Sequence, residues 1–185
     1  MTLASCISCL RIVLIVPIVY LLNQGWRVDS PSFYNYLAFG LFVIAGLTDY
    51  LDGYIARKTN TETQLGALLD LIADKLLVSL VMVWLVYMEM YASVAIPALI
   101  IVARELVIST LRQYVIEKRG KKHLSVSFIG KSKTTIQLIA ISMLILAQEI
   151  TSIYTLALIA IWFAALFSLY SLFMYVSEWS KDYLN

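Results

Sequence analysis

Four aspartates with regular spacing are the residues of this sequence best suited to chemistry. Asp49 and Asp52 occur in the stretch DYLDGYIAR at 49–57, and Asp70 and Asp74 occur in LLDLIADK at 68–75. Residues three or four positions apart lie on one face of a helix, so each stretch presents a pair of carboxylates. The linker between the stretches is short, which favours antiparallel helices whose acidic pairs face each other. Carboxylates gathered in this way repel one another and require protons, basic partners or divalent cations.

Hard divalent cations with oxygen ligands fit such a cluster best. Four aspartates are enough to hold two Mg²⁺ or Mn²⁺ ions about 3.5–4 Å apart. Small residues beside the acids, such as Gly53 and Ala56, would let a ligand approach the backbone closely. Arg57 adds a cation suited to bidentate phosphate contact. A single acidic pair at a helix end is more often only solvated, but four acids with glycines and an arginine favour a metal and phosphate site.

The composition indicates how these residues are positioned. The chain has 185 residues, of which 61% are hydrophobic and 14% charged, and its mean hydropathy is +0.84. Such a chain is solvated by lipid, where spanning segments are helices of about 20 residues. We predict an all-α membrane protein, one domain over 1–185, with six transmembrane helices at roughly 8–23, 33–57, 66–90, 92–118, 132–148 and 153–178. The segment TLASCISCL before Arg11 is expected to form a short N-terminal interfacial helix.

The distribution of basic residues predicts the orientation. With six helices both termini face one side, together with the second and fourth loops. These loops and their edges carry Arg57, Lys58, Lys118, Arg119, Lys121, Lys122 and Lys131, whereas the opposite loops carry only Arg27. The positive-inside rule therefore places both termini and the acidic cluster on the cytoplasmic side. Cys6 and Cys9 form a CxxC pair without a second pair, so no zinc site is expected.

The spacing of the first motif resembles a known signature. The pattern Asp49-x2-Asp52-Gly53-x2-Ala56-Arg57-x8-Gly66-x3-Asp70-x3-Asp74 is similar, position for position, to that of the CDP-alcohol phosphotransferases. The resemblance implies six transmembrane helices, a cytoplasmic two-metal site in a bacterial inner membrane, and a homodimer. It also implies that the four aspartates bind the metal ions and that Asp74 is the general base. The CDP part of CDP-diacylglycerol would be bound by Gly53, Ala56, Arg57 and Gly66.

A second polar region indicates the acceptor. Arg104 and Glu105 interrupt the apolar run AIPALIIVARELVISTL, and an ionisable residue inside a membrane helix is a functional candidate. Adjacent helix positions point about 100° apart, so we expect no Arg104–Glu105 pair. Arg112 lies two turns further along, and Lys131 and Lys133 follow in SFIGKSKTTIQ. Basic groups beside an acidic metal site predict an acceptor that carries its own phosphate.

The stretches ARELVISTLR and SFIGKSKTTIQ also resemble the bacterial phosphatidylglycerophosphate synthases within that family. This narrower resemblance implies that CDP-diacylglycerol and sn-glycerol 3-phosphate give phosphatidylglycerophosphate and CMP. The acceptor phosphate would be held by Arg104, Arg112, Lys131 and Lys133. The first-helix stretch SCISCLR departs from the family pattern, which often contains Asn and Thr there. We therefore expect the N-terminal segment to lie outside the site.

Three alternatives remain open. The first is a related enzyme that uses an inositol phosphate acceptor. The second is a cation or phosphate transporter, which would show inverted repeats and polar residues deep in several helices, whereas the charges here gather at one end. The third is an inactive scaffold, which would have lost an aspartate, but all four are present. The expected partners are membrane lipids, the two substrates and a second copy of the chain, with no nucleic acid.

Overall fold

The computed structural model describes residues 3–27, 32–59, 64–89, 91–119, 128–148 and 150–184, with side chains for fewer positions near the helix ends. All of the regular structure in these ranges is helical. The helices are α1 (Leu3–Arg27), α2 (Ser32–Thr59), α3 (Gln64–Glu89), α4 (Ala92–Arg119), α5 (Phe128–Ala147) and α6 (Thr151–Leu184). The prediction of an all-α protein with six helices is confirmed. Several helices are longer than the predicted ranges because the polar residues at their ends continue the helical path.

The apolar content of the helices identifies a multi-pass membrane protein. Among the described residues, four helices are long and apolar enough to cross a bilayer, at Cys6–Trp26, Leu68–Met88, Ala92–Leu111 and Ser152–Ser177. Two shorter apolar stretches, Phe33–Thr48 and Thr134–Ala147, lie in α2 and α5. Pro17 and Pro97 lie inside α1 and α4. Membrane helices tolerate such prolines because neighbouring groups satisfy the freed backbone carbonyls.

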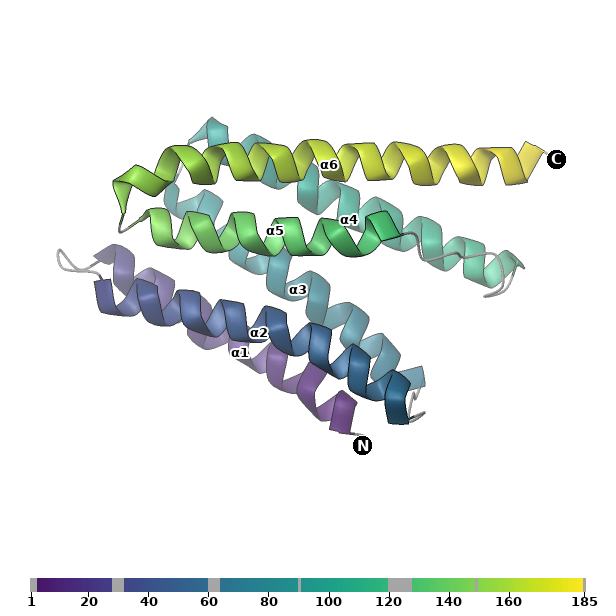
Figure 1. Cartoon of the computed structure of the whole chain (residues 1–185), viewed down its shortest axis with the longest axis horizontal. Helices are drawn as coiled ribbons and strands as arrows, with labels where there is room; N and C mark the ends of the chain where they lie inside the picture. The colour runs from purple at the N-terminus through teal and green to yellow at the C-terminus, as the bar shows by residue number, and fades with distance from the viewer. Residues whose placement is uncertain are drawn as a thin grey trace.

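The helices form two groups that meet along the middle of the bundle (Figure 1). α1 packs against α2 and α3, while α6 packs against α4 and α5; α2 joins the groups through α5. The two chain ends lie at the same end of the bundle as the end of α2 and the end of α4 (Figure 1). This is the arrangement that six antiparallel helices require. It brings the α3 aspartates, near the start of that helix, to the same end.

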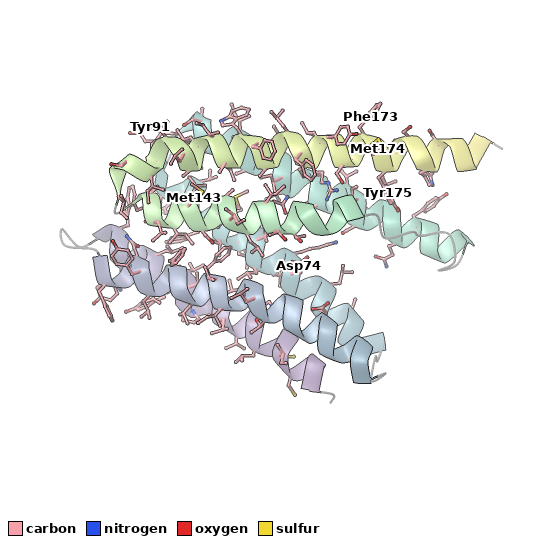
Figure 2. All side chains as sticks on the ribbon, viewed as in Figure 1. Asp74, Tyr91, Met143, Phe173, Met174 and Tyr175 are labelled. Atoms are coloured by element: carbon pink, nitrogen blue, oxygen red, sulfur yellow. The ribbon has the colours of Figure 1, made fainter. Side chains whose placement is uncertain are left out.

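The bundle is apolar outside and carries polar groups inside. Large apolar side chains face outward along every helix; Phe173, for example, points away from the bundle (Figure 2). Among the residues whose side chains the structure describes, the buried polar ones are Ser8, Arg11, Asn35, Arg104, Gln137, Ser168 and Ser171. A water-soluble protein has the reverse tendency, whereas a membrane protein keeps its ionisable groups between helices. The buried arginines of this set, Arg11 and Arg104, therefore need partners from neighbouring helices.

α1 and α2 pack closely against each other. Ile18 and Phe42, from α1 and α2, are completely buried. At the opposite end from the aspartates, Gly25 lies so close to Asn35 of α2 that a Cβ atom at Gly25 would overlap the Asn35 side chain. A larger residue at position 25 would therefore force the buried Asn35 side chain to move.

The predicted separate interfacial helix is not observed. α1 runs without interruption from Leu3, because nothing between Leu3 and Arg11 breaks a helix. Arg11 is 1% exposed and lies inside the bundle instead of at its surface. The prediction rested on sparing this arginine from the membrane interior, but the fold satisfies it with a carboxylate on α3.

Candidate active site

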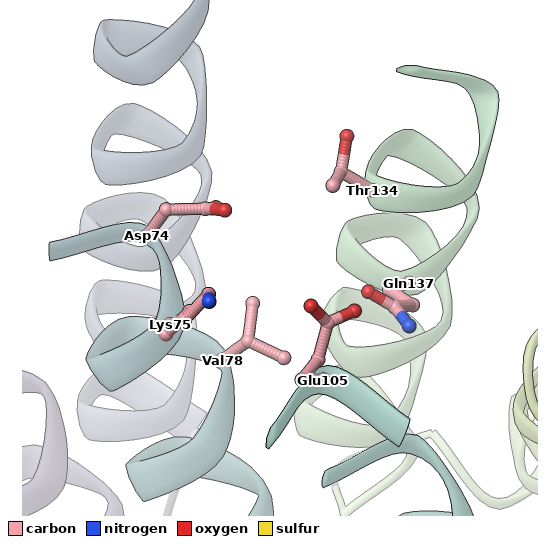
Figure 3. A pocket seen from close by; sticks show the side chains of 6 residues that line it. All are labelled: Asp74, Lys75, Val78, Glu105, Thr134 and Gln137. Carbon is pink, nitrogen blue, oxygen red and sulfur yellow. The ribbon is translucent and has the colours of Figure 1, made fainter. Parts of the chain in front are cut away.

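The best-described part of the site is the acidic face of α3. Asp70 and Asp74 lie one helical turn apart and are both partly buried. The Asp74 carboxylate points across the gap toward α5, where Thr134 projects from the opposite side (Figure 3). The two acids are therefore positioned on one face at the end of the bundle where both chain ends lie.

The other predicted acids lie on α2. The helix continues to Thr59, so Asp49 and Asp52 lie on a helix, as their spacing predicts. Their side chains, and those of Gly53, Ala56 and Arg57, lie outside the described residues. Among the side chains that are described, no group of three or more His, Cys, Asp or Glu gathers in a way that would hold a metal ion.

The donor chemistry of α3 still fits a hard divalent cation, because Asp70 and Asp74 supply only carboxylate oxygens. Two carboxylates leave such an ion incompletely coordinated by protein. α2, which carries Asp49 and Asp52, contacts α3 in only a few places. Both helices pack instead on α1. The relative position of the two acidic pairs is therefore set through α1.

Arg11 of α1 lies beside Asp70, a contact that the sequence reasoning missed. Its Nη1 lies 3.4 Å from Oδ1 of Asp70, and its side chain is fully buried while that of Asp70 is 44% exposed. The arginine thus fixes one of the two α3 acids and offsets part of its negative charge. The position of Arg11 inside the first apolar run could have indicated a buried ion pair. Because the sequence does not identify its partner, it was interpreted only as the end of a helix at the membrane interface.

Arg104 makes a set of contacts that joins α4 to α6. Its Nε donates to the Ser168 carbonyl at 3.2 Å and its Nη2 donates to Ser171 Oγ at 2.7 Å. Its Nη1 donates to Glu105 Oε1 at 3.2 Å. The Arg104 side chain is 4% exposed, and the Glu105 side chain is 14% exposed. Three directions of the guanidinium are therefore used inside the bundle.

The expectation that Arg104 and Glu105 would not pair is wrong. The directions of adjacent helix positions describe the Cβ atoms, whereas the long arginine side chain folds back to reach its neighbour. The ion pair stabilises both buried groups, because each charge alone would be far less stable in a medium of low polarity. The predicted contact of Arg104 with an acceptor phosphate stays a prediction.

A small pocket lies between α3, α4 and α5, beside Asp74 (Figure 3). It is lined by Asp74, Lys75, Val78, Glu105, Thr134 and Gln137. Lys75 Nζ donates a hydrogen bond to Ser109 Oγ of α4. The sequence reasoning singled out Asp74 but gave no site role to Lys75, Glu105 or Gln137. These residues are far apart in the sequence, so their proximity in the folded protein could not be inferred from it.

The remaining predicted residues are placed only by their helices. Gly66 is partly buried in the first turn of α3, Arg112 lies in α4, and Lys131 and Lys133 lie in the first turns of α5. The side chains of Arg112, Lys131 and Lys133 lie outside the described residues. Their roles in binding the acceptor phosphate stay predictions.

Comparison with known proteins identifies the family of the chain. Residues 1–170 match the family described as CDP-alcohol phosphatidyltransferase. A protein of Salmonella choleraesuis, named CDP-diacylglycerol--glycerol-3-phosphate 3-phosphatidyltransferase, is 41% identical over 148 residues, which cover 78% of this chain and 79% of that protein. A protein of the same name from Escherichia coli is 40% identical over the same shares. The helices, the acidic motif and these similarities together show that the chain belongs to the CDP-alcohol phosphatidyltransferase family.

Proposed function

We propose that this protein transfers the phosphatidyl group of CDP-diacylglycerol to sn-glycerol 3-phosphate, giving phosphatidylglycerophosphate and CMP. The relatives from Salmonella and Escherichia coli carry the name of this activity and align with most of the chain. The single structural observation that supports it best is the acidic face of α3, where Asp74 lines a small pocket between three helices. A base beside a space that admits a hydroxyl group is what attack by a hydroxyl requires.

The chemistry follows from these residues. Asp74 accepts the proton of the acceptor hydroxyl, whose oxygen forms a bond to the phosphorus that carries the diacylglycerol group. The bond from that phosphorus to the bridging oxygen breaks, and CMP leaves with the electron pair. The protein mainly positions the reactants and balances charge, which is typical of phosphoryl transfer.

Members of this family generally use a divalent metal. In our proposal Asp70 and Asp74, with Asp49 and Asp52 of α2, would hold two Mg²⁺ or Mn²⁺ ions. When bound, these ions would neutralise the diphosphate and the charge of the leaving CMP. Arg11 keeps Asp70 directed along one face of α3, so it acts as a positioning residue.

The diphosphate and the acceptor phosphate need separate basic groups. For the CDP part we propose contacts from Gly53, Ala56, Arg57 and Gly66. For the acceptor phosphate we propose Arg112, Lys131 and Lys133. Arg104 was expected to join this last set, but its donors to α6 and Glu105 favour a structural role that fixes α4.

The membrane arrangement is part of the same proposal. We propose that α2 and α5 cross the bilayer with the other four helices, in the inner membrane of a bacterium. The basic residues after α2 and around the α4–α5 connection favour a cytoplasmic location for both termini and for the acids. We further propose one domain over 1–185 and a homodimer, as the family resemblance implies.

An assay of acceptor-dependent CMP release tests the function directly. Purified protein is supplied with CDP-diacylglycerol and Mg²⁺, and glycerol 3-phosphate or inositol phosphate is added in turn. The proposal predicts CMP release with glycerol 3-phosphate that stops when the metal is chelated. Faster release with inositol phosphate would assign the related activity instead, and no release with either would contradict the proposal.

A further inference from the structure

Lys75 directly follows the proposed base on α3, and the mechanism proposed above does not use it. Its Nζ donates a hydrogen bond to Ser109 Oγ of α4. Glu105 lies one helical turn before Ser109 on α4 and carries a negative charge that attracts Lys75. Lys75 and Glu105 also line the pocket beside Asp74 (Figure 3). The lysine therefore connects the helix of the proposed base to α4 at the level of that base.

The two helix groups of the bundle carry different parts of the proposed site. α3 belongs to the group with the acids, whereas the basic residues proposed for the acceptor phosphate lie on α4 and α5 of the other group. The acceptor hydroxyl must reach Asp74 while its phosphate is held by this second group. The relative position of the groups is therefore part of the catalytic geometry. In such a geometry, a misplacement of about 1 Å can reduce the rate about 100-fold.

The contact between Lys75 and Ser109 lies close to both parts of the site. Asp74 is adjacent to Lys75 in the chain. Arg112, which we propose for the acceptor phosphate, follows Ser109 by three positions, or about one turn of α4. Arg104 holds α4 to α6 through its bonds to α6. Because α4 is fixed in this way, the contact with Lys75 determines where the acidic face of α3 lies relative to it.

The space beside Lys75 is too small for a substrate phosphate. The pocket that Lys75 and Glu105 line has a volume of about 10 Å³, which is close to the smallest space that admits one water molecule. A phosphate group does not fit there, and the Glu105 carboxylate would also repel it. At this point the ammonium group is therefore suited to contacts with α4 instead of with a substrate phosphate.

We propose that Lys75 is a positioning residue that holds the acidic face of α3 at a fixed place beside α4, so that an acceptor bound by its phosphate presents its hydroxyl to Asp74. This inference rests on the proposed function. A lysine suits the role, because its ammonium group can donate to a hydroxyl and attract a carboxylate one turn away. Without the contact the acceptor still binds, but its hydroxyl is misplaced relative to the base. Lys75 therefore affects turnover more than the affinity for the acceptor.

The test changes each side of the contact in turn. Lys75→Met keeps an unbranched side chain but removes the donor, Lys75→Arg retains a cation and a donor, and Ser109→Ala removes only the partner on α4. Glu105 keeps its contact with Arg104 in all of these variants. Thr110→Ala is the matched control, because Thr110 is the neighbouring hydroxyl residue of α4 but donates to carbonyls of its own helix.

Rates of CMP release, measured well below Tm, give kcat and the KM for glycerol 3-phosphate. We expect Lys75→Met to lower kcat by roughly 10- to 100-fold with KM nearly unchanged. Lys75→Arg should retain more of the parent kcat, and Ser109→Ala should show a smaller decrease in kcat. The double variant Lys75→Met with Ser109→Ala should equal Lys75→Met alone, because both changes remove one contact. Thr110→Ala should keep the parent values.

Four results would overturn the positioning role. A raised KM with an unchanged kcat would show that Lys75 binds the acceptor instead. A lower Tm with an unchanged kcat would show that the contact only stabilises the fold. Additive losses in the double variant would exclude action through Ser109. If Lys75→Met does not fold, equal kcat values for Ser109→Ala and Thr110→Ala would be sufficient. Absence of CMP release from the parent protein would instead refute the proposed function.

Discussion

Replacing Arg104 with methionine should destabilise the protein strongly, because this residue joins α4 to α6. The variant keeps a long apolar side chain but leaves Glu105, only 14% exposed, without its adjacent cation. Removing one partner of a buried ion pair costs about 3–5 kcal/mol. The lost bonds to Ser168 and Ser171 matter less, since a hydrogen bond between membrane helices contributes about 0.6 kcal/mol on average. The loss of the Arg104 cation beside the buried Glu105 carboxylate therefore dominates the expected decrease in stability.

The magnitude can be followed by thermal unfolding of purified protein in detergent at one scan rate. For a chain of this length each kcal/mol shifts Tm by about 2–4 °C, so Arg104→Met should lower Tm by roughly 6–20 °C. The double variant with Glu105→Gln removes the buried negative charge as well and should recover most of this loss, leaving about 1 kcal/mol from the bonds to α6. Ser171→Ala is the control for one of those bonds.

Two results would refute this reasoning. A Tm for Arg104→Met within about 2 °C of the parent would mean that the guanidinium contributes little to stability. Equal destabilisation of the single and double variants would mean that the Glu105 charge is not the cause. An unchanged Tm with a raised KM for the acceptor would support the role in phosphate binding that the sequence predicted for Arg104.

Three further predictions concern other parts of the fold. Asp74→Asn should reduce turnover by about 10²- to 10⁴-fold while the variant keeps the parent Tm; near-normal turnover would exclude Asp74 as the base. Arg11→Met should lower both Tm and turnover, whereas Arg11→Lys, which retains a cation for Asp70, should keep more of each; equal activity in both variants would contradict a positioning role. Gly25→Leu should lower Tm by forcing α1 away from Asn35 while kcat at low temperature stays near the parent value, and an unchanged Tm would show that the close approach is not needed.

Most of the helical architecture could be predicted from the sequence. Runs of apolar residues interrupted by short polar breaks determine helices in a lipid environment, where the backbone must satisfy its own hydrogen bonds. The breaks near 28–31, 60–63 and 149 were therefore placed correctly between helices. The start of α1 was not, because the partner that accommodates Arg11 lies on a different helix, 59 residues away.

The site shows the same division between local and distant information. The spacing of Asp70 and Asp74 is a local property of one helix and specified their common face. The pocket at Glu105 and Gln137 depends on how α3, α4 and α5 cross, which no local spacing encodes. The pairing of Arg104 with Glu105 depends on the burial of both side chains. A rule based on the directions of Cβ atoms could not predict it.

The central claim is that the acids of α3, together with those of α2, bind the divalent ions on which transfer depends. Electron paramagnetic resonance of Mn²⁺ added to the purified protein measures this binding without any turnover. We predict bound Mn²⁺ in the parent and in Glu105→Gln, whose acid is paired with Arg104, and its loss in Asp70→Ala and Asp74→Ala. Undiminished Mn²⁺ binding by folded Asp70→Ala and Asp74→Ala would contradict the claim.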